Sequence, residues 1–191
     1  KSPFVLNTIP RLRIDLNHFA FNKEELPMEP KLIRIKELKV LGIVRYGDGK
    51  DGEFNRVWGK WHDQNNDVQW KNDQVGYGLN FYPPDFKSMD EHYQYYMPCM
   101  EVENFDNIPM HMVAKKIPAC TCAVFAHKGM AMNIGELYHQ IFFKWLPNSG
   151  YELSEPFCIE VYDVRNNRWK GPDDPESETD LYIPVKESAL S

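Results

Sequence analysis

The chain lacks a long apolar run, a cysteine framework and the short glycine-rich motifs that bind phosphate. No apolar stretch approaches the roughly 20 residues needed to span a bilayer, and no signal-peptide pattern follows Lys1. Neither GxxxxGK[ST] nor GxGxxG occurs. The four cysteines form no CxxC pair (Cys99, Cys120, Cys122 and Cys158). We therefore expect no membrane insertion, no metal, no cofactor and a cytoplasmic location.

The composition favours a folded chain that does not bind nucleic acid through a large face of its own. A net charge of −6 argues against a phosphate-binding surface and fits weakly with cationic ligands. Hydrophobic residues make up 42% and aromatic residues 14% of the 191 residues, which permits a substantial core. The length fits one large domain or two small units that share a core.

The sequence contains a set of four landmarks twice, in the same order and at similar spacing. The offsets between the copies are 79, 84, 80 and 86 (115 − 36, 145 − 61, 160 − 80 and 182 − 96). Four landmarks in the same order indicate a duplicated unit. The first copy contains Lys36–Val40, Trp61, Leu79–Tyr82 and Tyr95–Pro98, and the second contains Lys115–Ala119, Trp145, Ile159–Tyr162 and Leu181–Pro184.

Each copy predicts a strand, a helix and a two-stranded hairpin. The helix of the first copy carries apolar residues at i, i+3, i+4 and i+7, ending at Trp61. Pro98 implies that its strand is an edge or contains a bulge. The predicted strands are 32–46, 75–82 and 93–102 in the first copy, and 113–127, 157–164 and 180–185 in the second, whose helix runs from Asn133 through Trp145. The sequence therefore predicts the α+β fold class, with two tandem strand–helix–hairpin repeats.

Strand alternation places one carboxylate where the other copy has an amide. Glu160 lies between Ile159 and Val161, and Asn80 occupies the matching position. A carboxylate in an apolar strand is costly to bury unless it is paired or awaits a cation, and aromatic rings around it would favour flat cations. The alternative is that Glu160 faces solvent or pairs with an internal Lys or Arg.

Several segments of the second copy resemble the GyrI-like small-molecule-binding domain, the effector-binding half of many AraC-type and MerR-type bacterial regulators. The resemblance covers 113–185 strongly and 32–102 more weakly. It rests on Ile117–Ala119, Ala123–Phe125, Lys128–Gly129, Glu136–Tyr138, Trp145–Pro147, Ser149–Leu153, Ile159–Asp163 and Asp173–Pro184.

The resemblance implies an effector domain over 31–187, with repeats at about 32–102 and 111–185. In it the two tandem strand–helix–hairpin repeats would form a pseudo-twofold antiparallel sheet with two main helices. Residues 1–30 would be an arm or linker that follows an absent helix-turn-helix domain, and the missing initiator Met fits a processed chain or an excised fragment. DNA would be contacted only through that absent domain.

The same resemblance implies a pocket near the pseudo-dyad that meets cationic, lipophilic ligands. Its glutamate carries over to Glu160, and Tyr162 and Tyr182 lie within the motifs of the family. Repeat symmetry and alternation add the candidates Asn80, Tyr82, Tyr46 and Trp145. The helical tryptophans are otherwise simple core residues.

The preferred hypothesis is a ligand-sensing domain of a transcription regulator that binds a hydrophobic, cationic small molecule. A second hypothesis is a hydrolase of strained electrophilic natural products, with Glu160 as general base. A third is a protein-interaction module of the gyrase-inhibitor type. The sequence indicates neither the ligand nor the oligomeric state.

Overall fold

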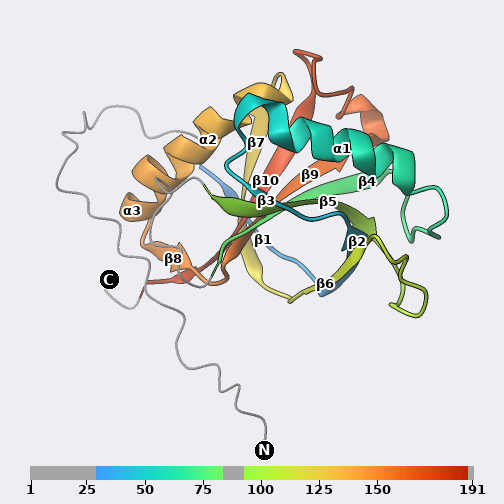
Figure 1. Ribbon diagram of the computed structural model, residues 1–191. Helices are drawn as coiled ribbons and strands as arrows, with labels where there is room; N and C mark the ends of the chain where they lie inside the picture. The colour runs from blue at the N-terminus through green and yellow to red at the C-terminus, as the bar shows by residue number, and fades with distance from the viewer. Residues whose placement is uncertain (1–28, 84–92, 189–191) are drawn as a thin grey trace, which may run out of the picture.

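The computed structural model describes residues 29–83 and 93–188, and these form one antiparallel sheet with two main helices on the same face (Figure 1). The predicted arm over 1–30 lies almost wholly outside the described residues. The sheet has ten strands, and the α+β fold of two repeats is confirmed. Within the described residues no helix is long and apolar enough to cross a membrane.

The elements follow one another in two similar series. The first series comprises β1 (Lys31–Arg34), β2 (Leu38–Gly42), β3 (Arg45–Gly47), α1 (Glu53–Gln64), β4 (Val75–Phe81) and β5 (Gln94–Glu101). The second comprises β6 (Val113–Ile117), β7 (Thr121–Lys128), α2 (Ile134–Gln140), α3 (Leu146–Asn148), β8 (Tyr151–Leu153), β9 (Phe157–Asp163) and β10 (Glu178–Glu187). A π-helical stretch (Ile141–Trp145) joins α2 to α3, so the second helix is continuous.

The strand order itself reveals the duplication. The main path runs β1-β7-β10-β9-β4-β5-β2-β6. The counterparts on this path are β1 and β6, β2 and β7, β4 and β9, and β5 and β10. Exchanging each strand for its counterpart gives the same order read backwards, as a pseudo-twofold axis requires. The axis passes between β4 and β9, where Leu79 pairs with Ile159, its own counterpart in the second repeat.

The two long strands that the sequence predicts at the start of each repeat are broken in the structure. Residues 32–46 form β1, β2 and β3, and residues 113–127 form β6 and β7. The breaks arise because β1 pairs with β7 and β6 pairs with β2, so each repeat gives its first strand to the other repeat. Periodicity within one repeat does not reveal such an exchange.

Pro98 lies on an inner strand rather than at an edge. β5 pairs with β4 on one side, where Pro98 lies opposite Gly78. On its other side the partner changes from β2, which ends at Gly42, to β3, which begins at Arg45. The missing N–H of Pro98 falls at this interruption, where no ladder bond is lost.

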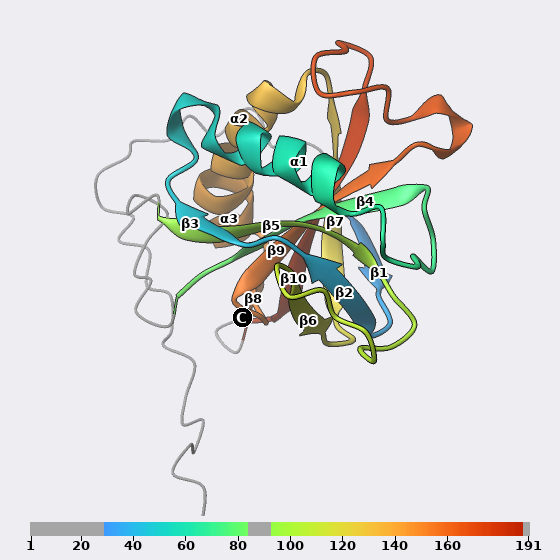
Figure 2. The ribbon, with the colours of Figure 1, turned by 45° about the vertical axis from the view of Figure 1, so that its right-hand side comes forward.

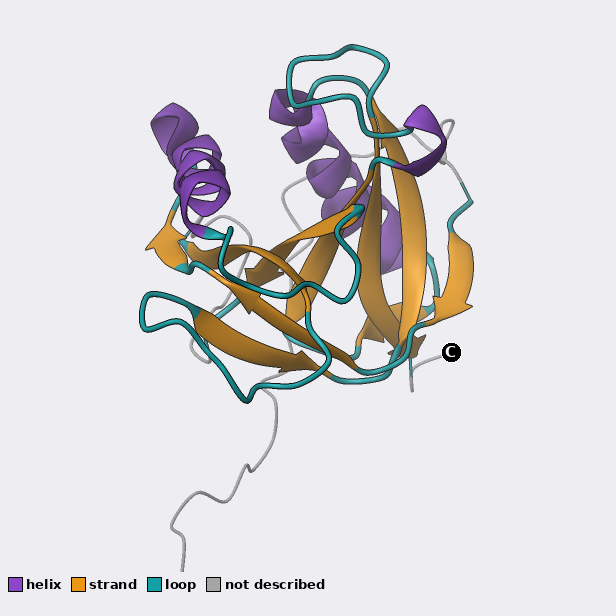
Figure 3. Cartoon of the chain, turned by 90° about the vertical axis from the view of Figure 1, so that its right-hand side faces the viewer, coloured by secondary structure: helices purple, strands orange, loops and turns teal. Residues whose placement is uncertain are grey.

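The sheet curls, so its two faces have different surroundings (Figures 2 and 3). Only three residues link β1 to β2, and three link β6 to β7, although each pair of strands belongs to opposite ends of the sheet. Links this short span at most about 14 Å, so the ends of the sheet approach one another. One face is covered by α1 and by α2 with α3, and the other is enclosed by the curl.

Apolar side chains fill both faces. On the helix side, Leu137, Ile141 and Phe142 pack on β7 and β10 in the second half, and Trp61 packs on Leu41 in the first half. The enclosed face holds a third cluster from β2, β4, β5, β6 and β9. The two helices thus flank the centre of the sheet, where Asn80 and Glu160 meet.

Candidate functional site: a buried carboxylate at the pseudo-dyad

Glu160 is buried at the centre of the sheet, on the face that the helices cover. Its exposed fraction is 4%, and that of Asn80 is 2%. The amide Nδ2 of Asn80 donates to Glu160 Oε1 at 3.0 Å. The carboxylate and amide that the repeat placed at matching positions are therefore direct partners.

Three tyrosine hydroxyls complete the shell of the carboxylate. Tyr162 donates to Glu160 Oε2 at 2.6 Å and Tyr96 donates to the same atom at 2.8 Å. Tyr138, from α2, donates to Oε1 at 3.2 Å. In the described part of the chain every hydrogen-bond partner of Glu160 is a neutral group, and its charge meets no Lys, Arg or His.

A second layer of donors fixes the direction of two of these hydroxyls. The indole Nε1 of Trp58 donates to the Tyr96 hydroxyl at 2.8 Å, and Asn80 Nδ2 also donates to the Tyr138 hydroxyl at 2.9 Å. An indole N–H can only donate. Because each of these hydroxyls accepts a hydrogen bond from Trp58 or Asn80, its own proton is directed at Glu160. This orientation stabilises an ionised carboxylate.

Burial and hydrogen bonding act on the Glu160 pKa in opposite directions. Burial raises the pKa of the Glu160 carboxyl above its usual value, and the donors from Tyr162, Tyr96, Asn80 and Tyr138 oppose that rise without cancelling it. The pKa values of Tyr96, Tyr138 and Tyr162 are raised well above 10.0 by burial and by the Glu160 charge. The hydroxyls therefore keep their protons at neutral pH.

Gly78 makes room for the carboxylate. It pairs with Glu160 across β4 and β9, and a Cβ added there would overlap Glu160 Oε2 and come within 2.6 Å of the Tyr96 hydroxyl. Gly76, two residues earlier, would place a Cβ only 3.5 Å from the Trp58 ring, an ordinary contact. The space around the carboxylate thus depends on Gly78 in particular.

Aromatic rings surround this polar centre. Phe54 stacks on Tyr96 with centroids 4.4 Å apart, and Trp58 meets Tyr162 edge-on at 5.2 Å. From the other helix, Tyr138 stacks on Phe142 at 6.3 Å. The carboxylate therefore lies among rings contributed by α1, α2 and the sheet.

The remaining candidates are distributed differently. Tyr82 is buried beside this centre and its hydroxyl donates to Cys158 Sγ at 3.8 Å. Trp145 packs edge-on against Phe125 at 4.9 Å, within the core beneath α2 and α3. Tyr46 is 49% exposed and contacts Tyr95 at 4.8 Å. The structure does not bring Tyr46 or Trp145 to the carboxylate.

Tyr182 lies on the opposite face of the sheet from Glu160. The landmarks of the sequence matched Tyr182 with Tyr96, at an offset of 86 (182 − 96), but the register pairs Asn80 with Tyr96 and Glu160 with Leu181. The counterpart of Tyr96 is therefore Leu181, at an offset of 85 (181 − 96). A slip of one residue moves a side chain to the other face.

Sequence reasoning missed Tyr96, Tyr138, Trp58 and Gly78 as parts of this centre. An offset of 85 would have matched Tyr96 with Leu181 instead of Tyr182. Tyr96 lies directly opposite Asn80 in the register of β4 and β5, and therefore on the same face. The two glycines of β4, spaced by two residues, were a further signal, because glycine inside a strand often marks a close approach. Nothing in the local sequence of α1 singles out Trp58 from Trp61.

The described residues contain no group of three or more His, Cys, Asp or Glu side chains arranged for a metal. Cys120 and Cys122 place their Sγ atoms 3.7 Å apart and form no disulfide. What the centre offers chemically is one negative charge, four neutral donors and several aromatic faces.

A duplicated α+β fold with a buried carboxylate between its halves defines a small-molecule-binding domain. The family model described as the GyrI-like small molecule binding domain matches residues 28–186, so the chain belongs to the GyrI-like family.

Known proteins resemble the chain over most of its length. It is 29% identical over 159 residues to the transcriptional regulator BrlR of Pseudomonas aeruginosa, covering 83% of this chain and 56% of BrlR. The chain thus spans little more than half the length of that relative.

Two solved structures share the fold. The structure of SAV2435 bound to tetraphenylphosphonium superimposes with a TM-score of 0.63 at 14% identity, covering 83% of this chain and 94% of that one. The C-terminal domain of EcmrR gives a TM-score of 0.62 at 18% identity, covering 83% and 97%.

Proposed function

We propose that the chain is the ligand-sensing part of a cytoplasmic bacterial transcription regulator, and that its ligand is a lipophilic cation held by Glu160. The observation that carries the proposal is the buried carboxylate that has only neutral partners among the described residues. A lone buried charge costs several kcal/mol even when it is hydrogen-bonded, and a cationic ligand would offset that cost.

The aromatic surroundings favour a particular kind of cation. Tyr96, Tyr138 and Tyr162 bring aromatic rings as well as hydroxyls close to the charge, and each cation–π contact contributes about 0.5–2 kcal/mol. The similar fold of SAV2435 holds tetraphenylphosphonium, whose charge is spread and shielded by phenyl groups. Such a cation loses little hydration on burial and matches a site that offers rings and one carboxylate.

The regulatory part of the proposal rests on the relation to BrlR, a transcriptional regulator. A DNA-binding helix-turn-helix domain before residue 1, with residues 1–30 as the arm, completes the proposed regulator. Binding can shift the regulator only by the difference in ligand affinity between its states. In cells carrying the whole gene, tetraphenylphosphonium should change transcription from the promoter that the regulator binds, and Glu160→Gln should abolish the response.

Isothermal titration with two ligands of the same shape tests the proposed ligand class. Tetraphenylphosphonium and tetraphenylborate differ chiefly in the sign of their charge, and we expect the cation to bind about 100-fold more tightly. Glu160→Gln should weaken cation binding about 30-fold or more, because removal of one partner from a buried charge pair costs about 2–5 kcal/mol.

The matched control is Glu152→Gln, which removes the same charge from an exposed carboxylate that pairs with Lys186 at 3.2 Å. It should leave the affinity for tetraphenylphosphonium within about twofold. Equal affinity for both ligands, or equal effects of the two substitutions, would remove Glu160 from the proposed role.

A further inference from the structure

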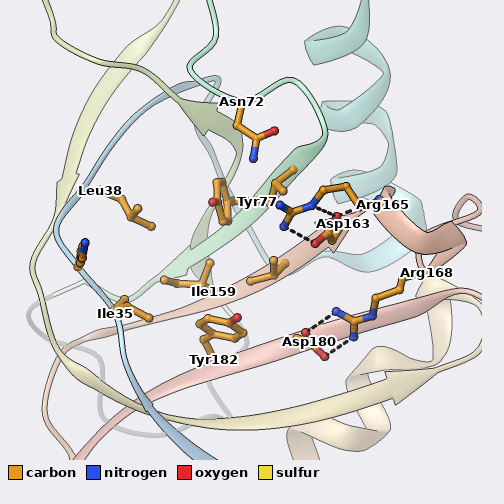
Figure 4. A pocket seen from close by; sticks show the side chains of 13 residues that line it. Ile35, Leu38, Asn72, Tyr77, Ile159, Asp163, Arg165, Arg168, Asp180 and Tyr182 are labelled. Carbon is orange, nitrogen blue, oxygen red and sulfur yellow. Dashed lines mark hydrogen bonds and ion pairs between the residues drawn. The ribbon is translucent and has the colours of Figure 1, made fainter.

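A hollow lies on the face of the sheet that the curl encloses, on the far side of β9 from Glu160. Its volume is about 300 Å³, at the lower end of the range for small-molecule pockets. Figure 4 shows Tyr77, Ile159 and Tyr182 across the sheet, with Ile35, from the link between β1 and β2, and Leu38, at the start of β2, facing them. The remaining lining residues are Lys36, Asn72, Val75, Val161, Asp163, Arg165, Arg168 and Asp180.

The duplication supplies an internal reference for this hollow, because the same place exists in the other half. By the strand registers, the counterpart of Val161 is Phe81 (161 − 81 = 80), and the counterpart of Asp180 is Tyr95 (180 − 95 = 85). Phe81 and Tyr95 stack with centroids 5.0 Å apart and an interplanar angle of 8°. Two rings therefore occupy the space that a smaller valine and an aspartate leave open in the second half.

The segment that covers each end of the enclosed face shows the same contrast. Ile35, in the link after β1, corresponds by the strand registers to Lys115 of β6 (115 − 35 = 80). Lys115 Nζ lies 3.8 Å from the centroid of the Phe81 ring, so β6 adds a further contact to the stacked rings. The fold can fill this place with side chains, and the second half does not.

Among the charged residues that line the hollow, the two arginines are paired and one lysine is not. Arg165 binds Asp163 through two hydrogen bonds of 2.8 and 2.6 Å, and Arg168 binds Asp180 through two of 2.9 and 2.8 Å. These pairs are the dashed contacts in Figure 4, and Arg168 also binds Glu178, which lies outside the lining, at 3.2 Å. Lys36 makes no ion pair within the described residues, so the edge favours an anion.

The apolar side chains of the hollow determine which kind of ring system the ligand would have. Ile159 and Val161 are buried between the half-buried rings of Tyr77 and Tyr182, an arrangement that packs well against a flat hydrophobic ring system. We propose that this hollow is a second small-molecule site, which binds a compact aromatic anion with its ring system over Ile159 and its acidic group toward Lys36. The two faces of β9 would then take ligands of opposite charge.

Two probes with the same ring system test the proposed charge preference. Isothermal titration with 2-naphthoate and 2-naphthylmethanol should give tighter binding for the carboxylate, by about tenfold. Equal affinities, or preference for the alcohol, would overturn the proposal. Failure of both probes to bind would overturn it too.

Substitutions copied from the other half locate the binding. Val161→Phe introduces the residue that fills the corresponding place in the first half, and it should lower 2-naphthoate affinity at least about 20-fold. Because the new ring enters an existing cavity, the melting temperature should not fall, which separates blocked binding from misfolding. Undiminished binding by a folded Val161→Phe variant would place the ligand elsewhere.

Lys36→Gln separates the acidic group from the ring system. It should weaken 2-naphthoate binding about fivefold and leave 2-naphthylmethanol unchanged, whereas Lys186→Gln, a surface lysine paired with Glu152, should change neither. A fall in affinity for the alcohol equal to that for the acid would contradict the assigned role of Lys36. These measurements use no cationic ligand, so their outcome is independent of the proposal for Glu160.

Discussion

The two halves of this fold share their backbone plan but differ at the positions that the pseudo-twofold axis brings together. Asn80 and Glu160 are counterparts, and so are Tyr96 and Leu181. The first half contributes Asn80 and Tyr96 to the shell of the carboxylate, and the second contributes Tyr162 and Tyr138. Neither half alone contains the charge with its full set of donors, so the site depends on divergence after duplication.

The two halves also differ on the enclosed face of the sheet. Phe81 and Tyr95 close one end of it, while Val161 and Asp180 leave the other end hollow. In both places the symmetric scaffold fixes the geometry and the departures from symmetry carry the chemistry. Substitution of the residues that make the halves different, or that protect the difference, should therefore disturb the site or the stability of the fold.

Gly78→Ala should have the largest effect on stability. The added Cβ would overlap Glu160 Oε2 and crowd the Tyr96 hydroxyl, which disrupts hydrogen bonds to a buried charge and overpacks the centre. We expect a loss of about 3 kcal/mol in the free energy of unfolding, measured by urea denaturation. Gly76→Ala, which adds the same methyl group on the same strand at an ordinary contact distance, should lose less than about 1 kcal/mol. Similar losses for both would contradict the role assigned to Gly78.

Glu160→Gln makes the two halves chemically alike and should change how stability depends on pH. Because burial raises the Glu160 pKa above 4.5, the folded protein holds a proton that the unfolded chain releases between pH 4.5 and the raised pKa. The wild type should therefore lose stability as pH rises through that window, by at most about 1.4 kcal/mol per pH unit, and no further above it.

The variant lacks this contribution, so its stability relative to wild type should increase from pH 4 to pH 7. Denaturation curves of both proteins across this range check the prediction. A difference between the two that is constant with pH would mean that the Glu160 pKa is the same in the folded and unfolded states.

Trp58→Phe should have the smallest effect of the three. It keeps a ring on α1 but removes the indole donor to the Tyr96 hydroxyl at 2.8 Å, which leaves that hydroxyl free to turn away from Glu160. We expect a loss of about 1 kcal/mol in the free energy of unfolding. The pKa of Glu160 should rise further, which ¹³C NMR of the side-chain carboxyl can follow. An unchanged pKa would show that Trp58 contributes packing alone.

The sequence was sufficient to predict the repeat, the fold class and the pairing of an amide with a carboxylate, because these follow from alternation and from landmarks shared by both copies. It did not predict that β1 and β6 are exchanged between the repeats, since an exchanged strand has the same local pattern as a retained one. The face on which Tyr182 lies depends on whether the offset is 85 or 86, and landmarks that drift from 79 to 86 cannot fix that value. Strand register, which only pairing reveals, decides it.

The affinity for tetraphenylphosphonium as a function of pH tests the central claim most directly, because it asks whether the ligand binds the ionised form of Glu160. We expect the affinity to fall about tenfold for each pH unit below the raised pKa of Glu160, because protons and the cation compete for one carboxylate. In Glu160→Gln the affinity should be weak and constant over the same range. A wild-type affinity that does not change with pH, or a fall of equal slope in the variant, would contradict the account.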